Sequence, residues 1–189
     1  PCLNIKQTAA NSILKGEQTL GFVCISPQTN LVSHRKITYN LLHWRLFEMA
    51  CAVNTIIADD HPLFRSALRQ AAATSVPEQY IKETSDIDGL FSLLKSHPEI
   101  ELIFLDLTIP GANGLQALSQ LRNQYPDILI IMVSANETPT IIKQAMSLGA
   151  AGYIPKSSSL DVISEAIEHV LNGDSWLPAD VDLTDVIVN

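Results

Sequence analysis

The chain has 189 residues, enough for one domain of ordinary size with an appendage, and 47% of them are hydrophobic, enough to build a core. Its formal net charge of −8 argues against a nucleic-acid-binding surface, which needs clustered Lys and Arg to neutralise phosphates. No apolar run approaches the ~20 residues of a membrane helix, so the sequence predicts a soluble protein that does not enter membranes.

The first 48 residues differ in charge from the rest. They carry five basic and two acidic residues, a balance of +3, whereas the remainder carries seven basic and eighteen acidic residues, a balance of −11. The chain begins with Pro1, while Met49 precedes a strand-like run. We interpret residues 1–48 as an N-terminal extension of unknown role and leave open whether it is native. It contains a short strand candidate, "TLGFVCIS", and a helix candidate, "ITYNLLHWRLFEMA".

The cysteines indicate the compartment. Cys2, Cys24 and Cys51 are odd in number and lack CxxC spacing, which favours neither a disulfide framework nor a zinc site. A reducing cytoplasm fits this usage best.

From residue 53 onward, strand-like and helix-like segments alternate. The strands are expected at 53–60, 79–83, 101–106, 128–134 and 151–155, and the helices at 62–74, 85–97, 114–124, 138–149 and 159–173. Ser85 is the expected cap of the second helix, and Leu63 and Leu160 are placed on the apolar stripes of the first and last. Five such units with fully apolar central strands predict a parallel sheet covered on both faces by helices, with right-handed crossovers.

Polar residues stand where the predicted strands end. Asp59 and Asp60 follow the first strand, Asp106 the third, Ser134 the fourth and Lys156 the fifth. The carboxyl ends of parallel strands share one edge of a sheet, so these side chains should converge. Three close carboxylates repel unless a cation offsets them, and Mg²⁺, a hard ion with oxygen ligands, suits this role. Asp106 would then be a nucleophile toward phosphorus, which requires its carboxylate to be open to solvent.

Each of these residues also has a simpler interpretation. An acidic pair after a strand often caps a helix, a lone Lys in a loop is usually solvated, and a Ser after a strand usually forms a turn. Their occurrence at successive strand ends favours a site, because caps and turns would fall at either end of the sheet.

Four motifs between residues 53 and 173 resemble the receiver domain of two-component response regulators of the NarL/FixJ (LuxR-type) subfamily. They are "ADDHPLFR", "LDLTIPGANGL", "MVSA" and "GYIPKSSS". The resemblance implies a receiver domain over 49–173 with a flavodoxin-like (CheY-like), doubly wound fold, five parallel strands in the order 2-1-3-4-5 and helices on both faces.

The resemblance also implies a role for each site residue. Asp106 is the phosphoacceptor, and Ser134 and Lys156 contact the phosphoryl group. Ser134 and Tyr153 form the switch, while Thr108 and Asn136 control the lifetime of the phosphorylated state. Mg²⁺ is held by Asp60, Asp106 and the backbone carbonyl of Thr108, with Asp59 acting through water. His61 is expected only to shape the start of the first helix.

By the same resemblance the chain is a phosphorylation switch that accepts its phosphoryl group from a sensor histidine kinase. It assists its own phosphorylation and dephosphorylation but is not otherwise an enzyme, and a homodimer is one outcome of activation. The subfamily binds DNA through a C-terminal helix-turn-helix domain and controls transcription with it. Only residues 174–189 follow Gly173, and we interpret them as the start of a linker with that domain absent.

Two other functions stay open. One is a degenerate or stand-alone receiver that serves as a protein–protein interaction scaffold. The other is an aspartate-nucleophile phosphohydrolase, which would place a second Asp where this chain has Thr108.

Overall fold

The computed structural model describes residues 53–179 and 181. The strand and helix expected within residues 1–48, and the expected linker at 180 and beyond 181, lie outside the described residues.

Five strands form one parallel sheet in the order β2-β1-β3-β4-β5. The central strands consist almost entirely of apolar residues that are buried on both faces, which is why their sequences do not alternate between apolar and polar. The predicted sheet and its strand order are confirmed. The strands are β1 (Asn54–Ala58), β2 (Ile81–Thr84), β3 (Ile100–Asp106), β4 (Leu129–Ser134) and β5 (Gly152–Pro155).

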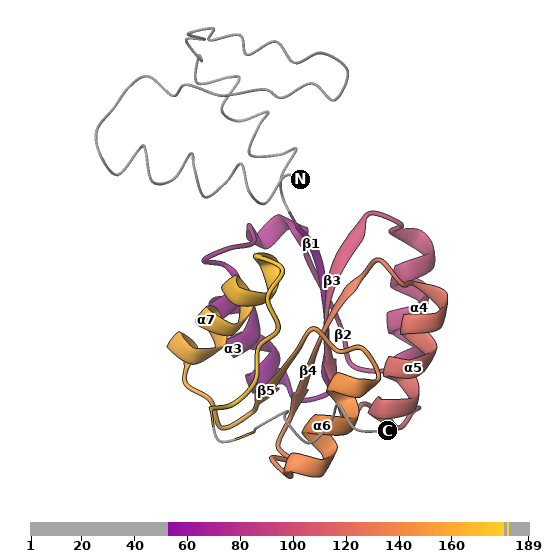
Figure 1. Cartoon of the computed structure of the whole chain (residues 1–189). Helices are drawn as coiled ribbons and strands as arrows, with labels where there is room; N and C mark the ends of the chain where they lie inside the picture. Colours follow the sequence, from indigo (N-terminus) through magenta and orange to yellow (C-terminus); the bar gives the residue numbers. More distant parts are fainter. Residues whose placement is uncertain (1–52, 180, 182–189) are drawn as a thin grey trace, which may run out of the picture. The chain divides into compact units, whose positions relative to one another are not determined.

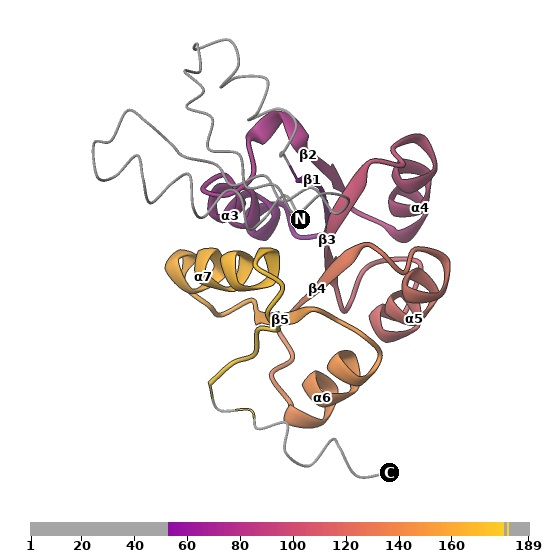
Figure 2. The ribbon, with the colours of Figure 1, turned by 45° about the horizontal axis from the view of Figure 1, so that its top comes forward.

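Helices cover both faces of the sheet, as predicted. Helices α3 and α7 lie together on one face and α4, α5 and α6 on the other (Figures 1 and 2). None of the helices in the described part of the chain is long and apolar enough to cross a bilayer. They are α3 (Pro62–Ala72), α4 (Ile87–Ser96), α5 (Gly114–Gln124), α6 (Pro139–Ser147) and α7 (Leu160–Leu171), and a 3₁₀ turn, η1 (Glu78–Tyr80), precedes β2.

Three local predictions are wrong. Helix α4 is capped by Asp86, whose Oδ1 accepts a hydrogen bond of 2.7 Å from the backbone N–H of Gly89, and not by Ser85. A carboxylate also interacts favourably with the helix dipole at this end. Leu63 and Leu160 are exposed, at 89% and 39% of their surface. Both lie in the first turn of their helices, and helical spacing identifies a face without showing whether a neighbour covers that turn.

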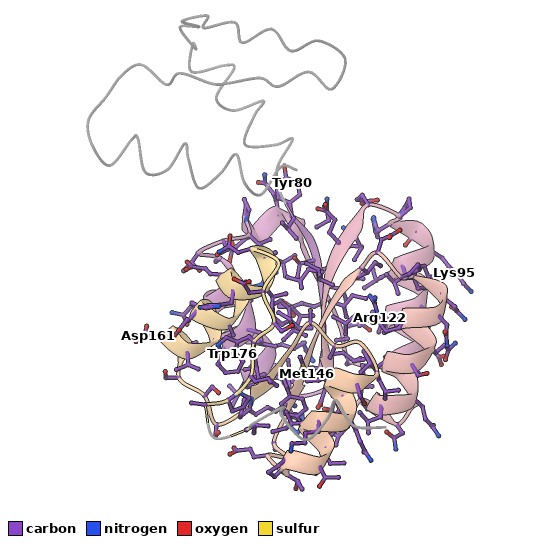
Figure 3. The ribbon with its side chains drawn as sticks, viewed as in Figure 1. Tyr80, Lys95, Arg122, Met146, Asp161 and Trp176 are labelled. Carbon is purple, nitrogen blue, oxygen red and sulfur yellow. The ribbon has the colours of Figure 1, made fainter. Side chains whose placement is uncertain are left out.

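The segment after α7 returns to the outer edge of the sheet. Trp176 pairs in parallel with Gly152 of β5, its N–H donating to the carbonyl of Ala151 (3.2 Å) and its carbonyl accepting from the N–H of Tyr153 (3.1 Å). Trp176 is labelled in Figure 3. Further along, Val181 is buried in the core. This part of residues 174–189 therefore packs on the domain.

Gly114, at the start of α5, should be intolerant of a side chain. A Cβ there would lie 2.5 Å from Cα and 2.6 Å from the carbonyl oxygen of Leu107, and both are backbone atoms that cannot swing away. We expect Gly114→Ala to lower the free energy of unfolding by about 1–3 kcal/mol, the usual cost of overpacking. Urea denaturation measures the loss. Gln116→Ala, at an exposed position on the same helix, is the control and should change stability by about 0.5 kcal/mol or less.

Candidate functional site

The carboxyl edge of the sheet collects the predicted polar residues. Asp59 and Asp60 follow β1 directly, and Asp106 is the last residue of β3. Each of these, together with His61, offers one ligand atom, and the four atoms all lie within 4.8 Å of one another. The structure therefore brings the three carboxylates together at one point, although they come from two strands that are far apart in sequence.

Lys156 supplies a positive charge to this cluster. Its Nζ lies 2.7 Å from Oδ2 of Asp59 and 2.9 Å from Oδ2 of Asp106. Both carboxylates are about 1% exposed, so without a cation each would be a costly buried charge. The backbone N–H of Lys156 donates to the carbonyl of Ser134 at 2.7 Å, which fixes the lysine beside the end of β4.

Two oxygen atoms of the acidic pair are available to bind a metal ion. Oδ1 of Asp59 accepts a 2.7 Å hydrogen bond from the backbone N–H of His61, and the Asp59 carbonyl accepts one of 2.6 Å from Arg65. Oδ2 of Asp59 and Oδ1 of Asp60 are buried atoms without a well-oriented hydrogen bond, even though Lys156 and His61 lie within ion-pair distance. Oxygen atoms with free lone pairs, gathered beside a third carboxylate, are suited to a divalent cation.

The carboxylate of Asp106 is covered, contrary to our expectation that it is open to solvent. Its side chain is 0% exposed. The backbone N–H of Thr108 donates to Oδ1 at 3.1 Å, and the Thr108 hydroxyl lies 3.2 and 3.1 Å from the two carboxylate oxygens. These donors and Lys156 Nζ surround the Asp106 carboxylate and shield it from solvent. Thr108 and Lys156, whose side chains contact the carboxylate, also line the adjoining pocket.

That pocket is bordered by the loop after β4. It is lined by His61, Thr108, Ser134, Ala135, Asn136, Glu137, Thr138 and Lys156. In this loop the Ser134 hydroxyl accepts from the N–H of Asn136 at 2.9 Å, and the Tyr153 hydroxyl donates to the carbonyl of Asn136 at 2.6 Å. Ser134 and Tyr153, the predicted switch pair, are thus joined through the backbone of a third predicted residue.

Tyr153 is fully buried in the core, and burial raises the pKa of its phenol. A hydrogen bond with Ser134 lowers this pKa, whereas the negative charges of Asp106 and Glu137 raise it further. The net shift is upward, so the folded chain favours the neutral hydroxyl that donates to Asn136.

The raised pKa predicts a loss of stability in alkali. The stabilising contribution of neutral Tyr153 is complete below the ordinary phenol pKa of 10.0 and is lost as the pH rises above it, because the unfolded chain ionises first. We expect Tyr153→Phe to cost about 1 kcal/mol near neutral pH, the worth of one hydrogen bond, and the difference from wild type to shrink above pH 10. Urea denaturation of both chains across this range measures it, and a constant difference would contradict the prediction.

His61 belongs to the cluster although the sequence assigned it only to the start of α3. Its Nδ1 lies 2.6 Å from Oδ1 of Asp60, 3.3 Å from Oδ1 of Asp59 and 3.2 Å from Nζ of Lys156. The available signal was its place directly after the acidic pair. That signal is weak, because a histidine at a helix start usually has no partner across the sheet.

The fold and site together define a class. A doubly wound sheet in the order β2-β1-β3-β4-β5, with acids and a lysine at its carboxyl edge, is the flavodoxin-like (CheY-like) arrangement. Residues 55–168 match the response regulator receiver domain. The chain belongs to this family of two-component signalling proteins.

Similar proteins agree with this assignment and with the expected NarL/FixJ (LuxR-type) subfamily. The chain is 43% identical over 126 residues to the glycerol metabolism activator of Pseudomonas putida, covering 67% of this chain and 57% of that one. It is 33% identical over 116 residues to the probable transcriptional regulatory protein NarL of Mycobacterium tuberculosis, covering 61% and 53%. The solved receiver domain of that organism's putative response regulator NarL matches with a TM-score of 0.56 and 30% identity, covering 65% and 98%. The chain thus spans little more than half the length of these curated relatives.

Proposed function

We propose that this chain is a phosphorylation-dependent signalling switch in which Asp106 accepts a phosphoryl group from the phosphohistidine of a sensor histidine kinase. One observation carries the proposal. A carboxylate at the end of β3 lies 2.9 Å from the ammonium of Lys156 and beside two further acids that leave oxygen atoms free. A nucleophile, a cation for phosphoryl oxygens and a place for a metal are the parts that phosphoryl transfer needs.

Mg²⁺ is the ion we propose for this place. Asp60, Asp106 and the backbone carbonyl of Thr108 would hold it, and Asp59 would act through water. When bound, it neutralises charge on the phosphoryl oxygens. For Asp106 to attack phosphorus, Lys156 and Thr108 must first release its oxygens. Lys156 Nζ then turns to the incoming phosphoryl group and supports its negative charge.

The structural effect of phosphorylating Asp106 would be transmitted through Ser134 and Tyr153. A phosphoryl group on Asp106 adds charge and acceptor oxygens that the Ser134 hydroxyl can meet by donating. Ser134 Oγ now accepts from Asn136, whose carbonyl accepts from Tyr153, so a shift of Ser134 moves the anchor of the tyrosine. The surface formed by α6, β5 and α7 would change in consequence. Thr108 and Asn136 border the same pocket and would control water access and so the lifetime of the aspartyl phosphate.

We extend the proposal to the whole protein by similarity. Residues 49–173 would be the receiver, working in the cytoplasm with a sensor histidine kinase and able to pair with a second copy. Transcriptional output would pass through a helix-turn-helix domain, since the relatives include a protein named as a transcriptional regulator. The buried carboxylate of Asp106 favours a second candidate, an interaction scaffold that is not phosphorylated.

Treatment of the full chain with acetyl phosphate and Mg²⁺ tests the proposal. We expect intact-mass spectrometry to show one added phosphoryl group per chain, and none when EDTA replaces Mg²⁺. Absence of labelling in both samples would favour the scaffold. Multiple turnovers of small phosphoesters, measured separately as released phosphate, would favour a phosphohydrolase.

A further inference from the structure

We propose that His61 is a further ligand of the acidic site and raises its affinity for ions that accept nitrogen, such as Co²⁺ and Ni²⁺, relative to its affinity for Mg²⁺. The inference rests on the proposed metal site and adds to it a residue that affects the relative affinity for different metals. The carboxylates alone form a hard, oxygen-only site, whereas an imidazole nitrogen makes the donor set mixed.

The position of the ring supports this role. Nδ1 of His61 lies 2.6 Å from Oδ1 of Asp60, 3.3 Å from Oδ1 of Asp59 and 3.8 Å from Oδ2 of Asp106. The four potential ligand atoms span at most 4.8 Å. Ligands at about 2.0–2.2 Å from one ion lie up to about 4.4 Å apart, so small side-chain adjustments suffice to place His61, Asp60 and Asp106 around it, with Asp59 acting through water.

The contacts of Nδ1 also suit an ion. Nδ1 lies within ion-pair distance of Asp60 Oδ1, at 2.6 Å, and 3.2 Å from Nζ of Lys156, while Asp60 Oδ1 has no well-oriented hydrogen bond. A divalent cation in place of the ammonium would be held by Nδ1 and would offset the charge of Asp60 at the same time.

His61 has no competing structural duty that would explain its place. It stands at the N-cap of α3, yet its side chain makes no capping hydrogen bond; its backbone N–H donates to Asp59 and its carbonyl accepts from the N–H of Arg65. The side chain is 61% exposed, so it is not needed to fill the core. The ring can therefore move toward an ion at little cost.

The chemistry sets the direction of the selectivity. Affinity for nitrogen-containing sites rises along the first-row divalent metals toward Ni²⁺ and Cu²⁺, and imidazole suits these ions well. Mg²⁺ prefers carboxylate, carbonyl and water oxygens and gains little from a nitrogen. Loss of the imidazole should therefore weaken Co²⁺ binding selectively.

Calorimetric titration of the full chain with Co²⁺ and, separately, with Mg²⁺ tests the inference. We expect His61→Ala to lower Co²⁺ affinity about tenfold or more while Mg²⁺ affinity changes little. The visible spectrum of bound Co²⁺ should also change on losing its nitrogen ligand. His97→Ala is the matched control, because His97 pairs with Glu99 outside the cluster and should leave both affinities unchanged.

The outcomes separate this inference from the proposed function. If His61→Ala keeps the wild-type ratio of Co²⁺ to Mg²⁺ affinity and the same Co²⁺ spectrum, His61 is not a ligand, while the metal site stands. If wild type binds neither ion, both the inference and the metal role in the proposed function fail. Thermal unfolding followed by circular dichroism checks that His61→Ala remains folded.

Discussion

Asp106→Asn is expected to abolish phosphorylation of the chain by acetyl phosphate. The amide has nearly the shape of the carboxylate, so the contacts with Thr108 and the buried position at the end of β3 can persist. An amide lacks the negative charge of a nucleophile, and it cannot offset the charge of the Lys156 ammonium, which lies 2.9 Å from Oδ2 in wild type. We expect labelling to fall below detection in intact-mass spectrometry.

The matched control for this variant is Asp161→Asn. Asp161 is an exposed acid in the first turn of α7 (Figure 3) and should label like wild type. Labelling that survives Asp106→Asn would place the acceptor elsewhere and contradict the proposed role of Asp106. The far-ultraviolet circular dichroism spectrum of the variant should match wild type, which shows that the loss is chemical.

Lys156→Met is expected to cause the largest loss of stability at the site, about 3–5 kcal/mol, as is typical of removing one partner from a buried ion pair. Methionine keeps the length of the side chain but removes the charge that lies 2.7 Å from Asp59 and 2.9 Å from Asp106. The two buried carboxylates would then repel each other with no cation between them. Urea denaturation at neutral pH measures the loss.

Mg²⁺ should restore part of this loss. An ion that binds only the folded chain stabilises it in proportion to the logarithm of its concentration over its dissociation constant, and uncompensated carboxylates should bind it more tightly. We therefore expect Mg²⁺ to stabilise Lys156→Met more than wild type. Lys95→Met, at an exposed position in the last turn of α4 (Figure 3), is the control and should change stability by about 0.5 kcal/mol or less. A Lys156→Met chain as stable as wild type would show that the ammonium does not offset the acids.

The strands and the class of fold were readable from the sequence because their signals are local. The run of Leu102 to Leu105 is buried on both faces, and a parallel sheet between two helical layers is the arrangement that buries such a run. The order of the strands came from the motifs and not from periodicity, since alternation of strands and helices is compatible with several orders.

The wrong predictions for the helix cap and for the apolar positions in the first turns each have a structural reason. Ser85 and Asp86 are adjacent residues that can both cap a helix, and only the backbone conformation at Asp86 decides between them. Leu63 fits the apolar spacing of α3 but lies in a turn that the rest of the domain does not cover. Composition cannot show which end of an amphipathic helix extends beyond its neighbours.

By itself, the sequence determined that Asp59, Asp60, Asp106 and Lys156 stand at strand ends, and the rule that parallel strands end at one edge was enough to predict their meeting. Only the tertiary structure decided how they meet. It placed the His61 ring against the acids, closed Thr108 and Lys156 over Asp106, and paired Trp176 with the edge of β5. Some of these contacts join residues distant in sequence, as Lys156 with Asp106 and Trp176 with Gly152, and others join near neighbours through the orientation of a side chain. Neither kind produces a periodic pattern in the sequence.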